Sequence, residues 1–122
     1  MTLQELYYEI GGDYEQAMRV LRMEKLVDKH IRKMRTNLVV EELIDAGDRI
    51  EPSKIFEAAH AMKGVCANLG LVGLAGMASE LAEEFRPGNR RRLSDEEVKT
   101  RIAKIDEAYK RTSDRIRRYE EG

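Results

Sequence analysis

The side chains best suited to chemistry are His60 and Lys63, which lie in one helix-forming segment, residues 52–69. A lysine three residues after a histidine brings a positive charge to its neighbourhood on a helix. Gly64 follows one turn after His60, although a glycine in a helix interior costs about 1 kcal/mol relative to alanine. A nucleophilic imidazole, a cation and an open space suit a bulky, strongly negative group. Phosphate is the obvious candidate, so the pattern indicates phosphoryl chemistry.

His60 lies on the polar side of this predicted helix. At about 100° per residue, His60 falls about 140° and Lys63 about 80° from an apolar stripe suited to core packing. That stripe is formed by Ile55, Ala59, Met62, Cys66 and Leu69.

 These five residues all lie within roughly 40° of one direction. A core histidine would have to lie on the stripe, so we favour an exposed, reactive imidazole. A surface histidine without a role would leave Gly64 unexplained.

Residues 59–70 read A-H-A-M-K-G-V-C-A-N-L-G. This segment resembles the signature of the histidine-containing phosphotransfer (HPt) domain family, which is approximately A-H-x-L-K-G-x-x-x-N-L-G. Met62 stands in place of the usual leucine, a nearly volume-conserving exchange at a buried position. The resemblance extends from Gly11-Gly12-Asp13 to about Phe85. The C-terminal third matches only as a generic long helix.

The resemblance implies a phosphorelay protein that passes phosphoryl groups between aspartates of response-regulator receiver domains, with a sensor or hybrid histidine kinase upstream. It makes His60 the phosphoacceptor, Lys63 the charge partner of the phosphoryl oxygens and Gly64 the residue that leaves room for the phosphoryl group or the partner. We expect no cofactor on this chain, and magnesium only on the receiver. Candidate docking residues around His60 are Ser53, Glu57, Ala61, Gly64 and Ala67.

Two other interpretations stay open. A docking module would keep the fold and bind receivers, or other signalling proteins, without carrying phosphate. An unrelated helical scaffold would carry the motif by accident, and His60→Gln would then change nothing.

Composition excludes several classes of protein. A chain of 122 residues fits a single domain, residues 1–122. A net charge of −1 argues against a nucleic-acid binder, and no apolar run suits membrane insertion or a signal peptide. The single cysteine, Cys66, excludes an internal disulfide and is expected to be buried. We expect a cytoplasmic protein that does not bind ATP, since no glycine-rich phosphate loop is present.

Helical spacing of apolar residues runs through nearly the whole chain, and no strand signal competes with it. We predict an all-α protein, an antiparallel four-helix bundle with short additional N-terminal helices over residues 1–22. The bundle, residues 23–120, is expected to comprise four helices, with a break near Thr36 in the first: 23–46, 52–69, 71–86 and 94–120. We expect a monomer, and a homodimer through the apolar seam of the last helix is compatible with the pattern.

Capping signals mark several helix ends. Ser94 and Glu97 form a capping box at the start of the last helix, and Asp13 with Gln16 resembles another. Gly47-Asp48 is expected to end the helix that begins after Asn37. His30 is expected to be a partly buried structural histidine.

For three residues the sequence leaves two structural interpretations open. Arg22 either joins or breaks the two helical pieces around it. Gly73 and Gly76 either permit a close helix approach or weaken their helix.

Overall fold

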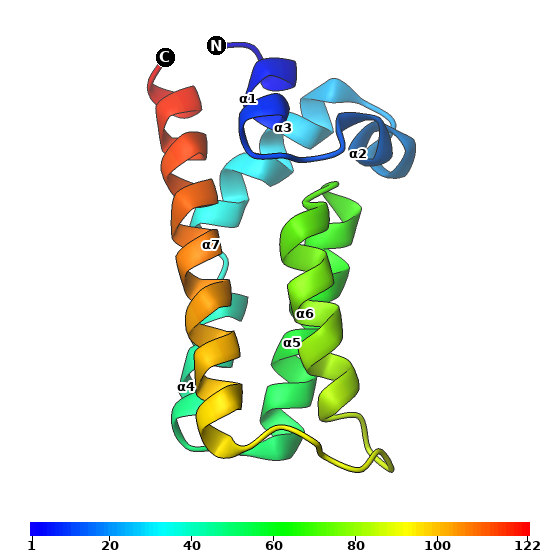
Figure 1. The fold of residues 1–122 in the computed structure, drawn as a ribbon. Coiled ribbons are helices and arrows are strands. Elements are labelled where there is room, and N and C mark those ends of the chain that lie inside the picture. Colours follow the sequence, from blue (N-terminus) through cyan, green and yellow to red (C-terminus); the bar gives the residue numbers. More distant parts are fainter.

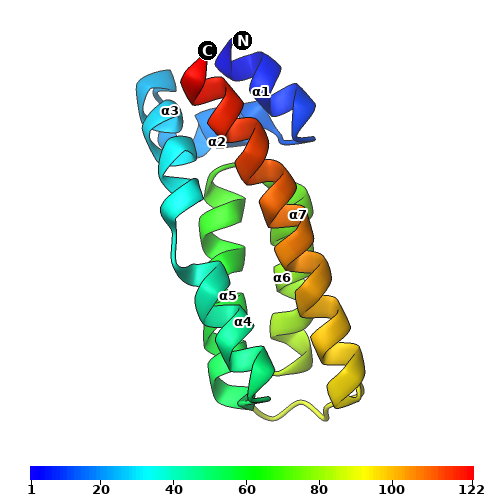
Figure 2. The ribbon, with the colours of Figure 1, turned by 90° about the vertical axis from the view of Figure 1, so that its left-hand side faces the viewer.

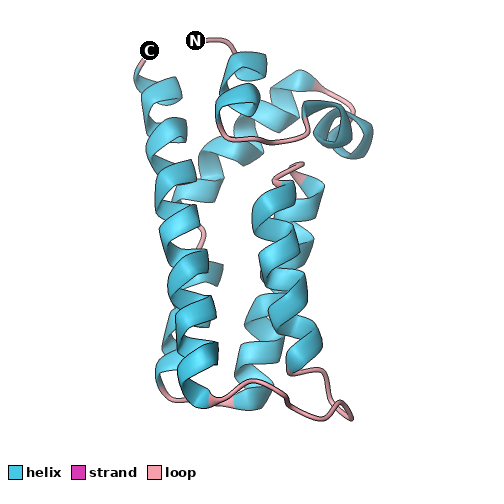
Figure 3. Ribbon diagram, viewed as in Figure 1, coloured by secondary structure: helices cyan, strands magenta, loops and turns pink.

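The computed structural model describes residues 1–122, and every regular element in it is helical (Figures 1 and 3). The elements are α1 (Leu3–Glu9), α2 (Tyr14–Leu21), α3 (Glu24–Lys33), the short 3₁₀ helix η1 (Met34–Thr36), α4 (Val39–Asp48), α5 (Pro52–Asn68), α6 (Val72–Glu84) and α7 (Asp95–Glu121). The predicted all-α class is confirmed.

The four-helix bundle is antiparallel, as predicted. Helices α4, α5, α6 and α7 run alternately down and up its length, and α3 extends the line of α4 toward the end where both termini lie (Figures 1 and 2). The boundaries predicted for the last three helices agree with α5, α6 and α7 to within one or two residues. The apolar seam of α7 packs inside this bundle. Its buried members are Val98, Ile102, Ile105 and Ile116.

The first bundle helix is broken where the sequence predicts a break. Residue Asn37 is extended, and its side-chain oxygen accepts a hydrogen bond from the Val39 backbone N–H at 2.9 Å. The Tyr109 hydroxyl donates to the carbonyl oxygens of Met34 at 2.7 Å and Arg35 at 3.0 Å. These bonds satisfy backbone groups that the break would leave without partners.

Helix α4 ends at Asp48, within the predicted Gly47-Asp48 stop, although Gly47 itself is helical and the helix runs beyond Ala46, its predicted last residue. Gly47 is buried, and a Cβ at this position would overlap the Ile102 side chain of α7. The glycine therefore serves close packing between α4 and α7. The chain turns after the helix, where Ile50 adopts a positive φ of 47°.

The N-terminal helices lie across one end of the bundle (Figures 1 and 2). Arg22 has a left-handed backbone with φ 66°, so it separates α2 from α3. Asp13 caps α2 by accepting from the Gln16 N–H at 3.0 Å. The predicted capping box is incomplete, because the Gln16 side chain donates to the Ala67 carbonyl of α5 at 2.7 Å instead.

Three hydrogen bonds attach these helices to the C-terminal end of α5. Besides the Gln16 bond, the Tyr7 hydroxyl donates to the Leu69 carbonyl at 2.7 Å, and the Asp13 N–H donates to the Gly70 carbonyl at 2.7 Å. The last carbonyls of a helix have no partner within the helix. The N-terminal helices therefore close the end of the helix that carries His60.

The two glycines of α6 are not sites of close packing. A Cβ at Gly73 or Gly76 would meet nothing within 4 Å. Neither glycine is needed for a helix approach, which leaves a weakened helix as the remaining interpretation.

Gly70 and Gly11 form a matched pair that tests the closure of α5. Both have positive φ, 68° and 65°, but only a Cβ at Gly70 would overlap the Asp13 carbonyl oxygen. Gly70→Ala is expected to lower the free energy of unfolding by about 3 kcal/mol, and Gly11→Ala by about 1 kcal/mol. Urea unfolding followed by circular dichroism measures both. Equal losses would show that the contact between Gly70 and Asp13 contributes nothing.

Candidate functional site

His60 lies on the exposed side of α5. The opposite side is buried in the core and contains Ile55, Ala58, Ala59, Met62 and Cys66. No hydrogen bond or ion pair joins the His60 imidazole to another group of the chain. Both ring nitrogens are therefore free to face a partner.

The closest aromatic neighbour of His60 is Phe56, one turn earlier on α5. The two rings are stacked, with centroids 5.6 Å apart and an angle of 19° between their planes. Phe56 is half-buried and packs against the core, whereas His60 is exposed. The sequence analysis missed this contact, although the spacing of four residues between two aromatic rings was a usable signal.

Lys63 lies on the side of α5 that faces α6. Its side chain is half-buried and makes no ion pair. The pKa of Glu83 on α6 is lowered chiefly by hydrogen bonds from Arg86 and Asn89. The positive charges of Arg86 and Lys63 lower it further, so the Lys63 ammonium acts on this side of α5. The ammonium group is thus available to a negative group that arrives at His60.

The region around Gly64 is open. A Cβ at Gly64 would meet nothing within 4 Å. The structure places the other candidate docking residues on the same helix: Ser53, Glu57 and Ala61 are exposed, and Ala67 is half-buried. Together with His60 these residues form one continuous strip of α5, which we call the His60 face.

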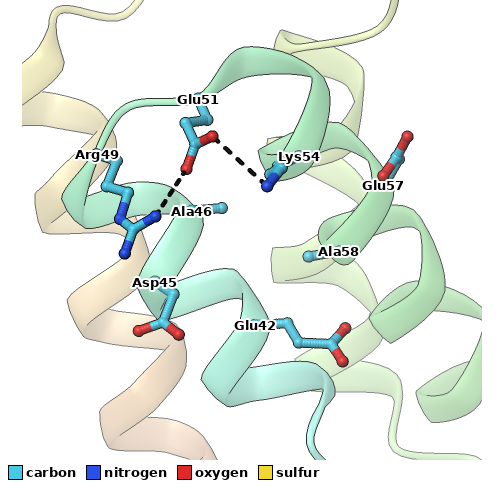
Figure 4. Close-up of a pocket in the computed structure, with 8 residues that line it drawn as sticks. All are labelled: Glu42, Asp45, Ala46, Arg49, Glu51, Lys54, Glu57 and Ala58. Carbon is cyan, nitrogen blue, oxygen red and sulfur yellow. Dashed lines mark ion pairs between the residues drawn. The ribbon is translucent and has the colours of Figure 1, made fainter.

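A surface pocket of about 360 Å³ adjoins the His60 face on the side of α4 (Figure 4). Glu51 lies in its wall, 4.0 Å from the Arg49 guanidinium and 3.7 Å from the Lys54 ammonium. Its other charged residues, Glu42, Asp45 and Glu57, make no ion pair.

The carboxylates of α6 are arranged differently. Glu80 is 3.4 Å from Arg101, and Glu83 is 2.9 Å from Arg86. The imidazole therefore has unpaired negative charge on its α4 side and the unpaired charge of Lys63 on its α6 side.

The second histidine is not part of this face. His30 is exposed, so the prediction of a partly buried structural histidine is wrong. It lines a separate groove with Lys33 of α3 and Asn68 at the end of α5. No group of three or more His, Cys, Asp or Glu side chains is placed to hold a metal ion.

A comparison with protein families settles the relationship of the chain. The family model described as the Hpt domain matches residues 22–115. The chain belongs to the Hpt domain family. No curated protein and no solved structure matches it significantly. Membership gives this Hpt domain a phosphotransfer function in two-component signalling, in which such domains interact with receiver domains and kinases.

The matched segment differs from the one that the sequence motif indicated. It begins at Arg22 and reaches Arg115, so most of α7 belongs to it and α1 and α2 do not. The expectation that the resemblance runs from Gly11 to about Phe85 is therefore wrong at both ends. No helix of this Hpt domain is long and apolar enough to span a bilayer.

The one cysteine of the Hpt domain is buried in the core, as expected. Burial raises the pKa of the Cys66 thiol from its ordinary value of 9.0 to about 12. A group whose pKa is raised by folding stabilises the fold fully below the unfolded pKa and loses that contribution as the pH rises through the folded pKa.

The free energy of unfolding is therefore expected to fall between pH 9 and pH 12, in part because the Cys66 thiol must stay protonated. Cys66→Ala removes this group and should make the fall shallower. Urea unfolding at a series of pH values measures the slope for both proteins. Identical slopes would contradict the assigned role of the thiol.

Proposed function

We propose that His60 accepts a phosphoryl group from the phosphorylated aspartate of one receiver domain and donates it to the aspartate of another. Membership of the Hpt domain family supports a phosphotransfer role. The observation that carries the assignment to His60 is its exposed imidazole, which has no partner in the chain and lies beside the unpaired Lys63 and the open space at Gly64.

The reaction needs few groups from this chain. The lone pair of one neutral imidazole nitrogen attacks phosphorus, a nitrogen–phosphorus bond forms, and the oxygen–phosphorus bond to the aspartate breaks. The aspartate leaves as a carboxylate with the bonding electron pair. The imidazole carries its proton on the other nitrogen throughout the attack, and the reverse sequence returns the phosphoryl group to a carboxylate.

Phosphoryl transfer depends chiefly on position and on neutralisation of charge. Lys63 would supply positive charge to the phosphoryl oxygens, and Gly64 would let the receiver approach the ring. The docking surface would be the His60 face, including Ser53, Glu57, Ala61 and Ala67. We expect the magnesium ion to be held by the receiver and not by this chain.

We further propose a monomer that works in the cytoplasm and receives its phosphoryl groups, through a receiver, from a sensor or hybrid histidine kinase. A small face of this kind suits a transient complex at the low end of interface sizes.

The test is to incubate the wild-type chain and His60→Gln with a panel of phosphorylated receiver domains. The wild type should gain one phosphoryl group that is labile in acid and stable in base, and His60→Gln should gain none. Intact-mass spectrometry and the lability of the modification measure this. Binding of receivers without phosphorylation would overturn the proposal in favour of a docking module, and the absence of both binding and phosphorylation would overturn it outright.

Gly64→Gln tests the open space on the His60 face. A Cβ at this position would meet nothing within 4 Å, so the fold should tolerate the substitution. It should obstruct the receiver and lower the rate of phosphoryl transfer on the order of tenfold or more. Stopped-flow or quench-flow transfer from a phosphorylated receiver measures the rate.

Gly73→Gln is the matched control. Gly73 also has open space around its Cβ position, but it lines a pocket between α6 and α7. Its substitution should leave the transfer rate unchanged. An equal loss in both variants would mean that Gly64 has no special place in docking.

A further inference from the structure

The stack between Phe56 and His60 is the contact that we expect to constrain the orientation of the imidazole. The centroids are 5.6 Å apart and the planes differ by 19°. His60 has no hydrogen bond that would fix its rotation. The terminal torsion of a histidine is broad in energy, so an exposed imidazole without a neighbour would sample many orientations.

Stacking restricts the ring without blocking the reaction. The lone pair of an imidazole nitrogen lies in the plane of the ring, and the new bond to phosphorus forms along it. Phe56 covers one face of the imidazole and leaves its edge free. A hydrogen bond to a ring nitrogen would instead occupy part of that edge.

The positions along α5 favour the same conclusion. Helical side chains lean toward the N-terminus of their helix. His60 therefore leans toward Phe56, four residues earlier, and Lys63 leans back toward His60. Phe56 and Lys63 lie on the same side of His60, about 20° apart around the helix axis.

We propose that Phe56 is a positioning residue, which holds the His60 imidazole edge-on to the incoming phosphoryl group and on the side of Lys63. This inference rests on the proposed function of His60. Phe56 is half-buried and packs against the core, which fixes its own ring and lets it serve as a support.

Phe56→Leu and Phe56→Tyr test the inference. Leucine keeps an apolar side chain of similar reach but removes the stacked ring, and tyrosine keeps the ring. Phe85→Leu is the matched control. It removes a buried ring at the end of α6, over which the Arg91 guanidinium lies. Each variant is first shown to be folded by circular dichroism. Transfer from a phosphorylated receiver is then measured over a range of receiver concentrations.

Phe56→Leu is expected to lower the maximal transfer rate roughly threefold to tenfold, with the half-saturating receiver concentration unchanged. Phe56→Tyr and Phe85→Leu should both stay within about twofold of the wild type. In proton NMR spectra, the ring-current shifts of the His60 imidazole protons should be lost in Phe56→Leu and kept in Phe56→Tyr.

An unchanged maximal rate in Phe56→Leu would overturn the inference while leaving the proposed function in place. A loss confined to the half-saturating concentration would also overturn it, since Phe56 would then be a docking contact. Failure of the proposed function is distinguished by the wild type itself, which would accept no phosphoryl group from any receiver, and the inference would fall with it.

Discussion

The arrangement of the whole molecule depends on the burial of one side of α5. Its apolar stripe packs against α4 and α6, and small residues such as Ala58 and Ala59 let these helices approach. Because the stripe is confined to one side, the opposite side is left to solvent along the length of the helix. Core packing alone therefore accounts for the exposure of His60.

The His60 imidazole is left without a polar contact from the rest of the chain. No carboxylate or carbonyl of the chain holds either imidazole nitrogen, and the nearest cation is left without an ion pair. On α6, Glu80 and Glu83 are paired with arginines, whereas Glu42, Asp45 and Glu57 on the other side of the ring make no ion pair. A partner that approached His60 would meet opposite charges on the two sides of the ring, and such an arrangement favours one orientation of approach.

Features that depend on local periodicity could be predicted from the sequence. Features that depend on a contact between residues far apart in the chain could not. Helix type and most boundaries followed from spacing and from caps such as Ser94 with Glu97, whose capping box the structure contains. The packing role of Gly47 was not predictable, because its contact is with Ile102, far along the chain. For the same reason, the Gln16 side chain donates to the distant Ala67 carbonyl and does not complete the local capping box. The positions of His60, Lys63 and Gly64 could be predicted from one helix alone, whereas the exposure of His30 depends on how α3 lies on the bundle.

The closure of α5 by the first two helices has a consequence for how such a domain is delimited. The segment matched by the family begins after α2, yet Tyr7, Asp13 and Gln16 donate hydrogen bonds to carbonyls at and just beyond the C-terminal end of α5. At the other end, Ile116 is buried and Tyr119 bonds to Asp28, both beyond the matched residues. The unit that folds is thus larger than the unit that similarity outlines. A boundary drawn from similarity alone would remove residues that support the helix carrying His60.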